Sequence, residues 1–414
     1  MATTQHAPEV PDVVTIEVQP GTTVIVTSDL HFASARTEAS AWAETEVGAA
    51  LERVRGPAVL VLAGDIFELW AGANPDAATA MASHPRFASG VTDFARAQDR
   101  HVVCLPGNHD GRLGWDPVAA AVAESLGARL AFAVDLVAPG TNDGGARRVH
   151  VEHGHRWDPA NMFENPRDSL DTPLGQHIVQ EVLPDLASRD QSGVLAGVES
   201  LEDPRSFPAF VTSRIFYRRV LKETRWLLVP LVLAVGIHFG IALLDAPAKL
   251  HLRARDFVIF DVSIVLLALV TAVVLVLAGR HAWKGATLTA VNKRGKSQND
   301  NARAAAQDLV RAGYQGMVSG HTHHPELTAL DGGFYANTGS GTKVVEQLDA
   351  RLDLPHVFEA RLQLSWVELE ATDHGWAAHL VIGRRPQPGT RFERLATPSA
   401  ERLPEDPTVV RSYP

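Results

Sequence analysis

Acidic and histidine residues recur along this chain in four short motifs that could bind metal ions. The motifs are Asp29-Leu-His31, Gly64-Asp65, Gly107-Asn108-His109-Asp110 and Gly320-His321-Thr322-His323. Carboxylate, amide and imidazole groups form a mixed oxygen and nitrogen ligand set, which suits Mn, Fe, Zn or another borderline divalent ion. Two ions held roughly 3.5 to 4 Å apart need a bridging carboxylate, and Asp65 is the natural bridge. Such a pair activates water and clamps phosphoryl oxygens, which is the chemistry of phosphoester hydrolysis.

The motifs need elements that bring them together, and apolar runs that end just before them are typical of buried strands. These runs cover residues 23–27, 58–63, 101–105, 148–152 and 316–319. Helical patterns at 38–54 and 116–126 alternate with them, as in α/β proteins. Open α/β sheets bind ligands beyond the carboxyl ends of their strands. We therefore expect five strand ends to deliver the motifs, together with His153, to one rim.

With these motifs in this order, the sequence resembles the calcineurin-like metallophosphoesterase superfamily over residues 21–165 and about 300–345. The resemblance implies a double β-sandwich flanked by helices and a dinuclear metal site. It implies that Asp29, His31, Asp65 and His323 bind one metal, and that Asp65, Asn108, His153 and His321 bind the other. His109 would then lie beside the leaving group and stabilise or protonate it, with Asp110 orienting His109.

Within the superfamily, residues 62–70, 153–154 and 301–325 look most like the UDP-2,3-diacylglucosamine hydrolase branch. That branch typically carries arginine at the position of His109. A long apolar insertion in this chain is a second departure from it.

Two apolar runs, 226–244 and 257–278, separate the two blocks of motifs. Each has about the length needed to cross a hydrocarbon core of roughly 30 Å. Basic residues precede the first run and follow the second, so the positive-inside rule places both flanks in the cytoplasm. We therefore predict a two-helix transmembrane hairpin, in a multi-pass protein of the cell (plasma or inner) membrane with a cytoplasmic catalytic domain. The alternative is a pair of long core helices, which His238 and Asp261 favour.

The predicted fold is an α/β two-sheet sandwich flanked by helices, with an inserted helical segment and the hairpin. Its segments are an N-terminal extension (1–20), the first part of the phosphoesterase domain (21–165), a helical insert or cap (166–225), the hairpin (226–279), the second part of the domain (280–385) and a Pro-rich tail (386–414). The tail is expected to be disordered or loosely held, because proline and charge dominate it.

Two interpretations of the helical insert stay open. It is either an anchor beside the membrane or a cap that takes substrate from the membrane surface. In a cap, Arg167 and His177 would contact phosphate. His155, two residues after the predicted ligand His153, would contact substrate or support the ligands.

Composition limits the remaining classes of function. The 414 residues include 48 acidic and 38 basic ones, for a net charge of −10, which argues against binding nucleic acid by bulk charge. The single cysteine, Cys104, excludes a disulfide framework. The first twenty residues lack the apolar core of a signal peptide. A GxxxxGK[ST] phosphate loop is absent from the sequence, which favours hydrolysis over transfer from a nucleotide.

The sequence thus predicts a membrane-anchored phosphoesterase with two divalent ions, with Mn preferred and Fe or Zn also suited. It would cleave a phosphomonoester or pyrophosphate bond in a phosphorylated small molecule or a lipid-linked substrate. Two alternatives stay open: a phosphodiesterase acting on a cyclic or dinucleotide, and a membrane scaffold that keeps metal without turnover. Retention of all seven ligands and of His109 favours the enzyme.

Overall fold

The structure is a computed structural model. It describes residues 9–72, 75–139, 147–190, 193–201, 203, 206–220, 229–243, 254–289, 297–351, 354–387, 389–397 and 403–414.

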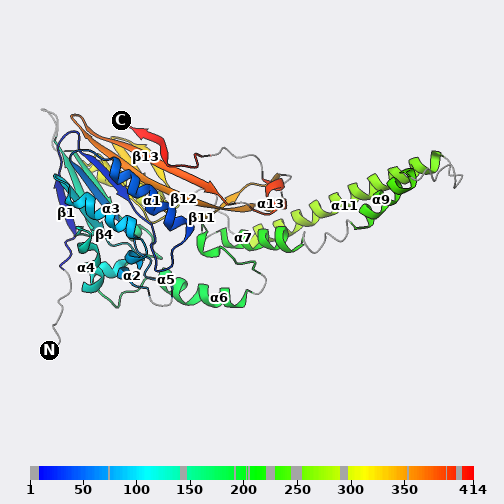
Figure 1. Cartoon of the computed structure of the whole chain (residues 1–414), viewed down its shortest axis with the longest axis horizontal. Coiled ribbons are helices and arrows are strands. Elements are labelled where there is room, and N and C mark those ends of the chain that lie inside the picture. Colours follow the sequence, from blue (N-terminus) through cyan, green and yellow to red (C-terminus); the bar gives the residue numbers. More distant parts are fainter. Residues whose placement is uncertain are drawn as a thin grey trace.

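Two β-sheets packed face to face form the body of the protein (Figure 1). The six-stranded sheet has the order β1 (Val13–Glu17), β6 (Ala133–Ala138), β7 (Arg147–Glu152), β8 (Gly316–Ser319), β10 (Gly333–Asn337) and β9 (Glu326–Leu330). The eight-stranded sheet has the order β14 (Thr408–Tyr413), β13 (Gly375–Pro386), β12 (Val357–Thr372), β2 (Thr23–Thr27), β3 (Ala58–Ala63), β4 (Arg100–Leu105) and β5 (Arg129–Leu130), and β11 (Lys343–Leu348) pairs with β12.

The alternation of side chains along each strand explains why the two sheets pack together and why helices cover them. On β2, Val24 and Val26 enter the apolar core between the sheets, whereas Ile25 enters the core on the other face. That outer core is shared with α1 (Glu38–Arg53), α2 (Ala77–Ala82), α3 (Pro85–Arg96) and α4 (Pro117–Ser125). On the other sheet, α12 (Asp300–Arg311) packs on Met317 and Tyr335. The predicted α/β two-sheet sandwich flanked by helices is confirmed.

The strand ends that carry the motifs meet because their strands are parallel neighbours. β2, β3 and β4 pair in parallel, and so do β7 and β8. Their carboxyl ends therefore lie at common edges, and the loops that follow them bond to one another. The N–H of Asp29 donates to the carbonyl of Gly64 at 3.0 Å, and the N–H of Gly320 donates to the carbonyl of His153 at 2.8 Å.

Helices dominate the segment between β7 and β8. It contains η2 (His155–Trp157), α5 (Leu174–His177), η3 (Ile178–Val182), α6 (Leu183–Arg189), η4 (Val198–Ser200), α7 (Phe207–Arg214) and η6 (Ile215–Val220). α7 packs on β12 through the buried rings of Phe210 and Phe358, whose centroids are 5.3 Å apart. Arg214, one of the basic residues that precede the first apolar run, is buried in this contact.

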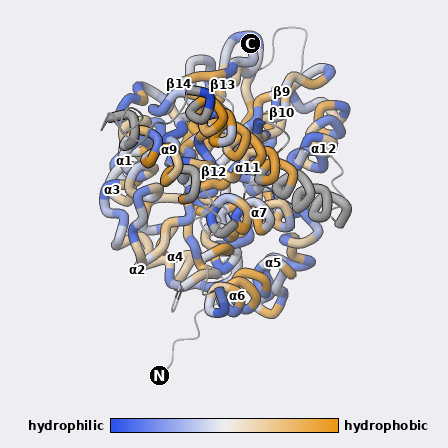
Figure 2. The backbone as a smooth tube through the Cα atoms, turned by 90° about the vertical axis from the view of Figure 1, so that its right-hand side faces the viewer, coloured by the Kyte–Doolittle hydropathy of each residue, from blue (hydrophilic) through white to orange (hydrophobic). Residues whose placement is uncertain are grey.

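The two apolar runs form α9 (Val229–Leu243) and α11 (Ala254–Thr289), which lie side by side and extend away from the sandwich (Figure 1). Figure 2 colours much of α11 as hydrophobic, and many apolar side chains of the pair are exposed. His238 and Asp261 join the two helices, with 3.2 Å between Nδ1 and Oδ1.

The membrane prediction is wrong for these helices. Across the ranges that the structure describes, no helix combines the length and the apolar character needed to span a bilayer. The transmembrane hairpin is therefore unsupported, and the multi-pass membrane localisation with a cytoplasmic catalytic domain is contradicted.

The C-terminal segment also differs from its prediction. α13 (Arg391–Ala396) begins at a capping box in which Thr390 and Glu393 bond to each other's backbone N–H groups. β14 then pairs with β13 and ends the eight-stranded sheet. The expectation of a loosely held tail is wrong for these two elements, because hydrogen bonds to a distant strand hold the chain there.

Candidate metal centre

The backbone at the predicted ligands has an unusual conformation. Among the described residues, six that are not glycine have positive φ, and five of them are predicted ligands: Asp29 (52°), His31 (47°), Asp65 (51°), His321 (72°) and His323 (58°). The left-handed region strains residues with a Cβ, and such strain persists where the surroundings impose it, commonly at functional sites. The loops therefore aim these side chains at a cost to the backbone.

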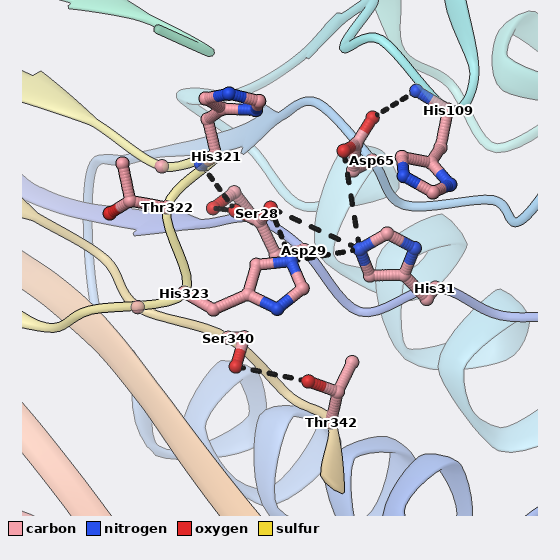
Figure 3. Close-up of polar contacts among 12 residues, drawn as sticks. Ser28, Asp29, His31, Asp65, His109, His321, Thr322, His323, Ser340 and Thr342 are labelled. Carbon is pink, nitrogen blue, oxygen red and sulfur yellow. Dashed lines mark hydrogen bonds and ion pairs between the residues drawn. The ribbon is translucent and has the colours of Figure 1, made fainter. Parts of the chain in front are cut away.

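Three overlapping groups of side chains could each hold a metal ion, because the potential ligand atoms within a group all lie within 4.8 Å of one another. Figure 3 labels all of their members except His153. The groups are Asp29, His31 and His323; His31, Asp65 and His109; and Asp65, His153 and His321. Asp65 and His31 each belong to two groups. The structure thus brings together the residues that the sequence assigned to two neighbouring metals.

The first predicted ligand set surrounds a buried carboxylate oxygen. Asp29 Oδ1 is fully buried and has no hydrogen-bond partner among the described residues, while His323 Nε2 lies 3.2 Å from it. The Nε2 atoms of His31 and His323 face each other at 3.2 Å. The other oxygen of Asp29 accepts the backbone N–H of His321 at 2.9 Å, which ties the two sheets together. An orphaned carboxylate oxygen beside two imidazole nitrogens fits a bound cation.

The second predicted set is equally compact. His153 Nε2 lies 3.2 Å from Asp65 Oδ2 and 3.1 Å from the amide oxygen of Asn108. His321 Nδ1 lies 2.9 Å from the same amide oxygen. The donor set of carboxylate, amide and imidazole therefore fits a second divalent cation next to the first.

Hydrogen bonds on the far side of each ring set which nitrogen faces the cluster. His153 Nδ1 donates to the carbonyl of Ala63 at 2.9 Å, so its Nε2 is left as the ligand atom. His31 Nδ1 donates to Glu68 at 3.0 Å, and His321 Nε2 donates to Asp158 at 3.0 Å. These carboxylates fix the tautomers of His31 and His321.

Sequence reasoning missed Glu68 and Asp158. Glu68 lies three residues after Asp65, and Asp158 lies five residues after His153. A carboxylate shortly after a ligand motif was the available signal, because histidine ligands usually donate their second N–H to such a group.

The buried carboxylates and histidines of the cluster stabilise each other's charged forms. Although burial raises it, the pKa of Asp65 lies well below its usual range because His153 and His109 are close. Burial lowers the pKa of His153, but Asp65 and Asp29 raise it to about 10. Protonated histidines thus balance buried carboxylates here, which is the charge balance that bound cations would supply.

His109, the predicted leaving-group residue, is held by contacts on three sides. Its Nδ1 donates to Glu68 Oε2 at 2.9 Å, its ring stacks on Trp70 at 4.0 Å between centroids, and its edge meets His31. Burial lowers the pKa of His109, but Glu68 and Asp65 raise it to about 9. His109 is therefore cationic at neutral pH.

Asp110 does not orient the His109 ring, which is the role of Glu68. The buried carboxylate of Asp110 accepts hydrogen bonds from the backbone N–H groups of Asp65, Ile66, Phe67 and Gly107 at 2.6 to 3.2 Å. Burial and the charge of Asp65 raise the pKa of Asp110, and the backbone donors oppose this rise. Asp110 therefore shapes the loop that carries Asp65.

The three predicted substrate residues differ in position. His155 lies beside the cluster, with its ring 5.4 Å from His153 and 6.4 Å from His321. Arg167 instead pairs with Asp12 at 2.6 Å, and His177 pairs with Glu181 at 3.1 Å. In the described part of the chain, these contacts do not connect Arg167 or His177 to the cluster.

Comparisons with known proteins agree with this geometry. Residues 22–214 match the family model of calcineurin-like phosphoesterases, a stretch that includes the predicted ligands up to His153 and ends before His321. No curated protein matches the chain. The UDP-2,3-diacylglucosamine hydrolase branch is therefore not confirmed.

Among solved structures, phosphopantetheinyl hydrolase from Mycobacterium tuberculosis is similar at 16% sequence identity and a TM-score of 0.27, over 78% of this chain and 92% of that chain. At this TM-score the likeness carries no argument about fold or substrate. The match to the family model is separate from this likeness: residues 22–214, slightly less than half of the chain, match calcineurin-like phosphoesterases, and this match indicates a metal-dependent phosphoester hydrolase.

Proposed function

We propose that this protein hydrolyses a phosphomonoester or pyrophosphate bond with two divalent metal ions, for which Mn is our first choice. One observation carries the proposal. The single carboxylate of Asp65 belongs to both histidine groups, with Oδ2 at 3.2 Å from His153 Nε2 and 4.0 Å from His31 Nε2. A carboxylate shared in this way is the bridge that a two-metal site requires.

In this proposal Asp29, His31, Asp65 and His323 hold one ion, and Asp65, Asn108, His153 and His321 hold the other. The bound ions would supply activation of water and neutralisation of phosphoryl charge. The chain itself supplies His109, which Glu68 holds as a cation beside Asp65. A cationic imidazole there stabilises the charge that develops on the leaving oxygen, or donates a proton to it.

The experiment uses the full chain purified with Mn²⁺ and three substrates: an aryl phosphate, an aryl phosphodiester and a UDP-sugar pyrophosphate. The last tests the resemblance of residues 62–70 to the diacylglucosamine hydrolase branch, and the diester tests the phosphodiesterase alternative. Elemental analysis gives the metal content of each sample.

We expect hydrolysis of the aryl phosphate or of the pyrophosphate, and a fall of at least about a hundredfold in kcat for Asp65→Ala and Asn108→Ala. Asp93→Ala, at a carboxylate that is 76% exposed, is the matched control and should keep full activity. Metal-loaded wild-type protein that is no more active than Asp65→Ala on any substrate would make the protein a metal-binding scaffold instead.

A further inference from the structure

A cavity of about 240 Å³ lies between the helical insert and the paired strands β11 and β12, and none of its lining residues belongs to the metal cluster. Its lining includes Arg214, Arg218, Lys343, Val345, Phe358 and Ala360. Its volume is several times the roughly 30 Å³ that one water molecule takes in the liquid, so a phosphate group with part of a larger molecule fits inside.

Strand alternation places the charges of the β11–β12 ribbon on opposite faces. Val345 pairs with Ala360, and Lys343 pairs with Leu362, so these four side chains share the face that looks into the cavity. Glu346 and Arg361 lie on the other face, where they pair with each other. The ribbon therefore contributes a cation and apolar side chains to the cavity, and keeps the carboxylate of Glu346 away from it.

The insert adds two guanidinium groups at the opposite wall. The Arg214 side chain is only 4% exposed, its Nη1 lies 3.1 Å from Glu393 Oε1, and its guanidinium carbon lies over the Phe210 ring, 5.0 Å from the ring centroid. Arg218 Nε reaches the same oxygen at 3.4 Å. Arg214 Nε is buried and has no hydrogen-bond partner among the described residues.

Glu393 cannot neutralise all three cations. Its Oε1 is shared by Arg214 and Arg218, and its Oε2 accepts the backbone N–H of Thr390 at 2.7 Å. The one charge of Glu393 against those of Arg214, Arg218 and Lys343 leaves a net charge of +2 around the cavity. A buried, unpaired N–H in a positively charged cavity is the arrangement that binds an oxyanion.

In the sequence, the cavity residue Lys343 lies close to a residue that bonds to the backbone of the predicted metal ligand Asp29. The N–H of Gly341 donates to the carbonyl of Asp29 at 3.0 Å, and Lys343 begins β11 two residues later. Two residues of extended chain cover about 7 Å. An anion at Lys343 is thus near enough to belong to the same molecule as a phosphate at the metals.

We propose that this cavity binds an oxyanion, a phosphate or carboxylate, through Arg214, Arg218 and Lys343. The oxyanion is either a second charged group of the substrate or a separate small anion. The first source rests on the proposed function, whereas binding in the cavity does not.

Calorimetric titration of the metal-free full chain with inorganic phosphate at low salt tests the binding. Lys343→Gln and Arg218→Gln should each weaken phosphate binding at least tenfold, because each removes a charge-assisted contact. Arg311→Gln, at a side chain that is 70% exposed, should bind phosphate as the wild type does. Thermal unfolding verifies that every variant is folded.

Unchanged phosphate binding in folded Lys343→Gln and Arg218→Gln would overturn the proposal. Binding that His109→Gln abolishes and the cavity variants retain would also overturn it, since the phosphate would then occupy the metal cluster. These outcomes are independent of catalysis, so a failure of the proposed function does not affect them.

Kinetics distinguish the two sources. If the oxyanion belongs to the substrate, Lys343→Gln should raise the KM of a nucleoside diphosphate at least tenfold and leave the KM of an aryl phosphate unchanged. If the oxyanion is a separate ion, Lys343→Gln should change neither KM, although it weakens phosphate binding to the metal-free chain.

Discussion

Replacing Glu68 with glutamine should weaken metal binding although it changes the shape of the side chain very little. In the structure, Oε2 of Glu68 accepts from His31 Nδ1 at 3.0 Å and from His109 Nδ1 at 2.9 Å. Its Oε1 accepts the backbone N–H groups of Trp70 and Ala71 at 2.8 and 2.9 Å. One carboxylate therefore satisfies four donors.

Glutamine has one acceptor oxygen where glutamate has two. If the glutamine oxygen points toward the histidines, the amide NH₂ faces the two backbone N–H groups, which then lack an acceptor. Turned toward the backbone, it leaves the NH₂ against two imidazole N–H groups. Each orientation leaves two donors unpaired, at about 1–3 kcal/mol each when buried. Since the Glu68 side chain is 14% exposed, we take the lower end, a total of about 2 kcal/mol.

About 2 kcal/mol corresponds to roughly a thirtyfold loss of metal affinity, within the range found for groups that orient metal ligands. Competition with a chelator for Mn²⁺ measures this affinity, and kcat at saturating metal reports the separate effect on His109. Glu52→Gln, at an exposed position on α1, is the control. Metal affinity equal to that of the wild type in folded Glu68→Gln would refute the role of Glu68 as the residue that orients His31.

Two further predictions concern stability and strain. Burial lowers the pKa of His150, but Asp135 and Glu152 raise it to about 9. The ion pairs of protonated His150 therefore contribute at most about 3 kcal/mol to the free energy of unfolding. This contribution is complete below pH 6.5 and is lost as the pH rises through 9. Urea unfolding at pH 6 and pH 10 should show a fall in stability that is larger in the wild type than in His150→Gln by up to about 3 kcal/mol; an equal fall in both would contradict the assignment. Gly64→Ala should lower metal content and activity sharply, because a Cβ there would lie 2.5 Å from His153 Nδ1. Gly56→Ala has a similar positive φ but open space around it, so it should cost about 1–2 kcal/mol of stability and leave metal content unchanged.

The strands that carry the site were predictable from local pattern. Residues 23–27, 58–63 and 316–319 were predicted as strands and form β2, β3 and β8 with the same bounds. Such strands are buried on both faces, so nearly every residue is apolar, and the first polar residue marks the end. Parallel pairing then requires the ends to meet, which is why the cluster could be expected before its geometry was known.

Features that depend on distant contacts were not predictable in this way. Glu68 lies in an ordinary apolar stretch, and its role depends on the pairing of Phe32 with Phe67, which brings the loops after β2 and β3 together. β14 follows a Pro-rich stretch and exists because β13 offers it a free edge.

The pairing of β12 with β2 has a consequence for the order in which the molecule can be built. β2 lies near the start of the chain and β12 near its end, and β8 must enter between β7 and β10 to bring His321 and His323 to the rim. During synthesis, the first half of the chain emerges with Asp29, His31 and Asp65 already present but with an open strand edge and an incomplete ligand set. The seven predicted ligands can therefore come together only after β8 has joined its sheet.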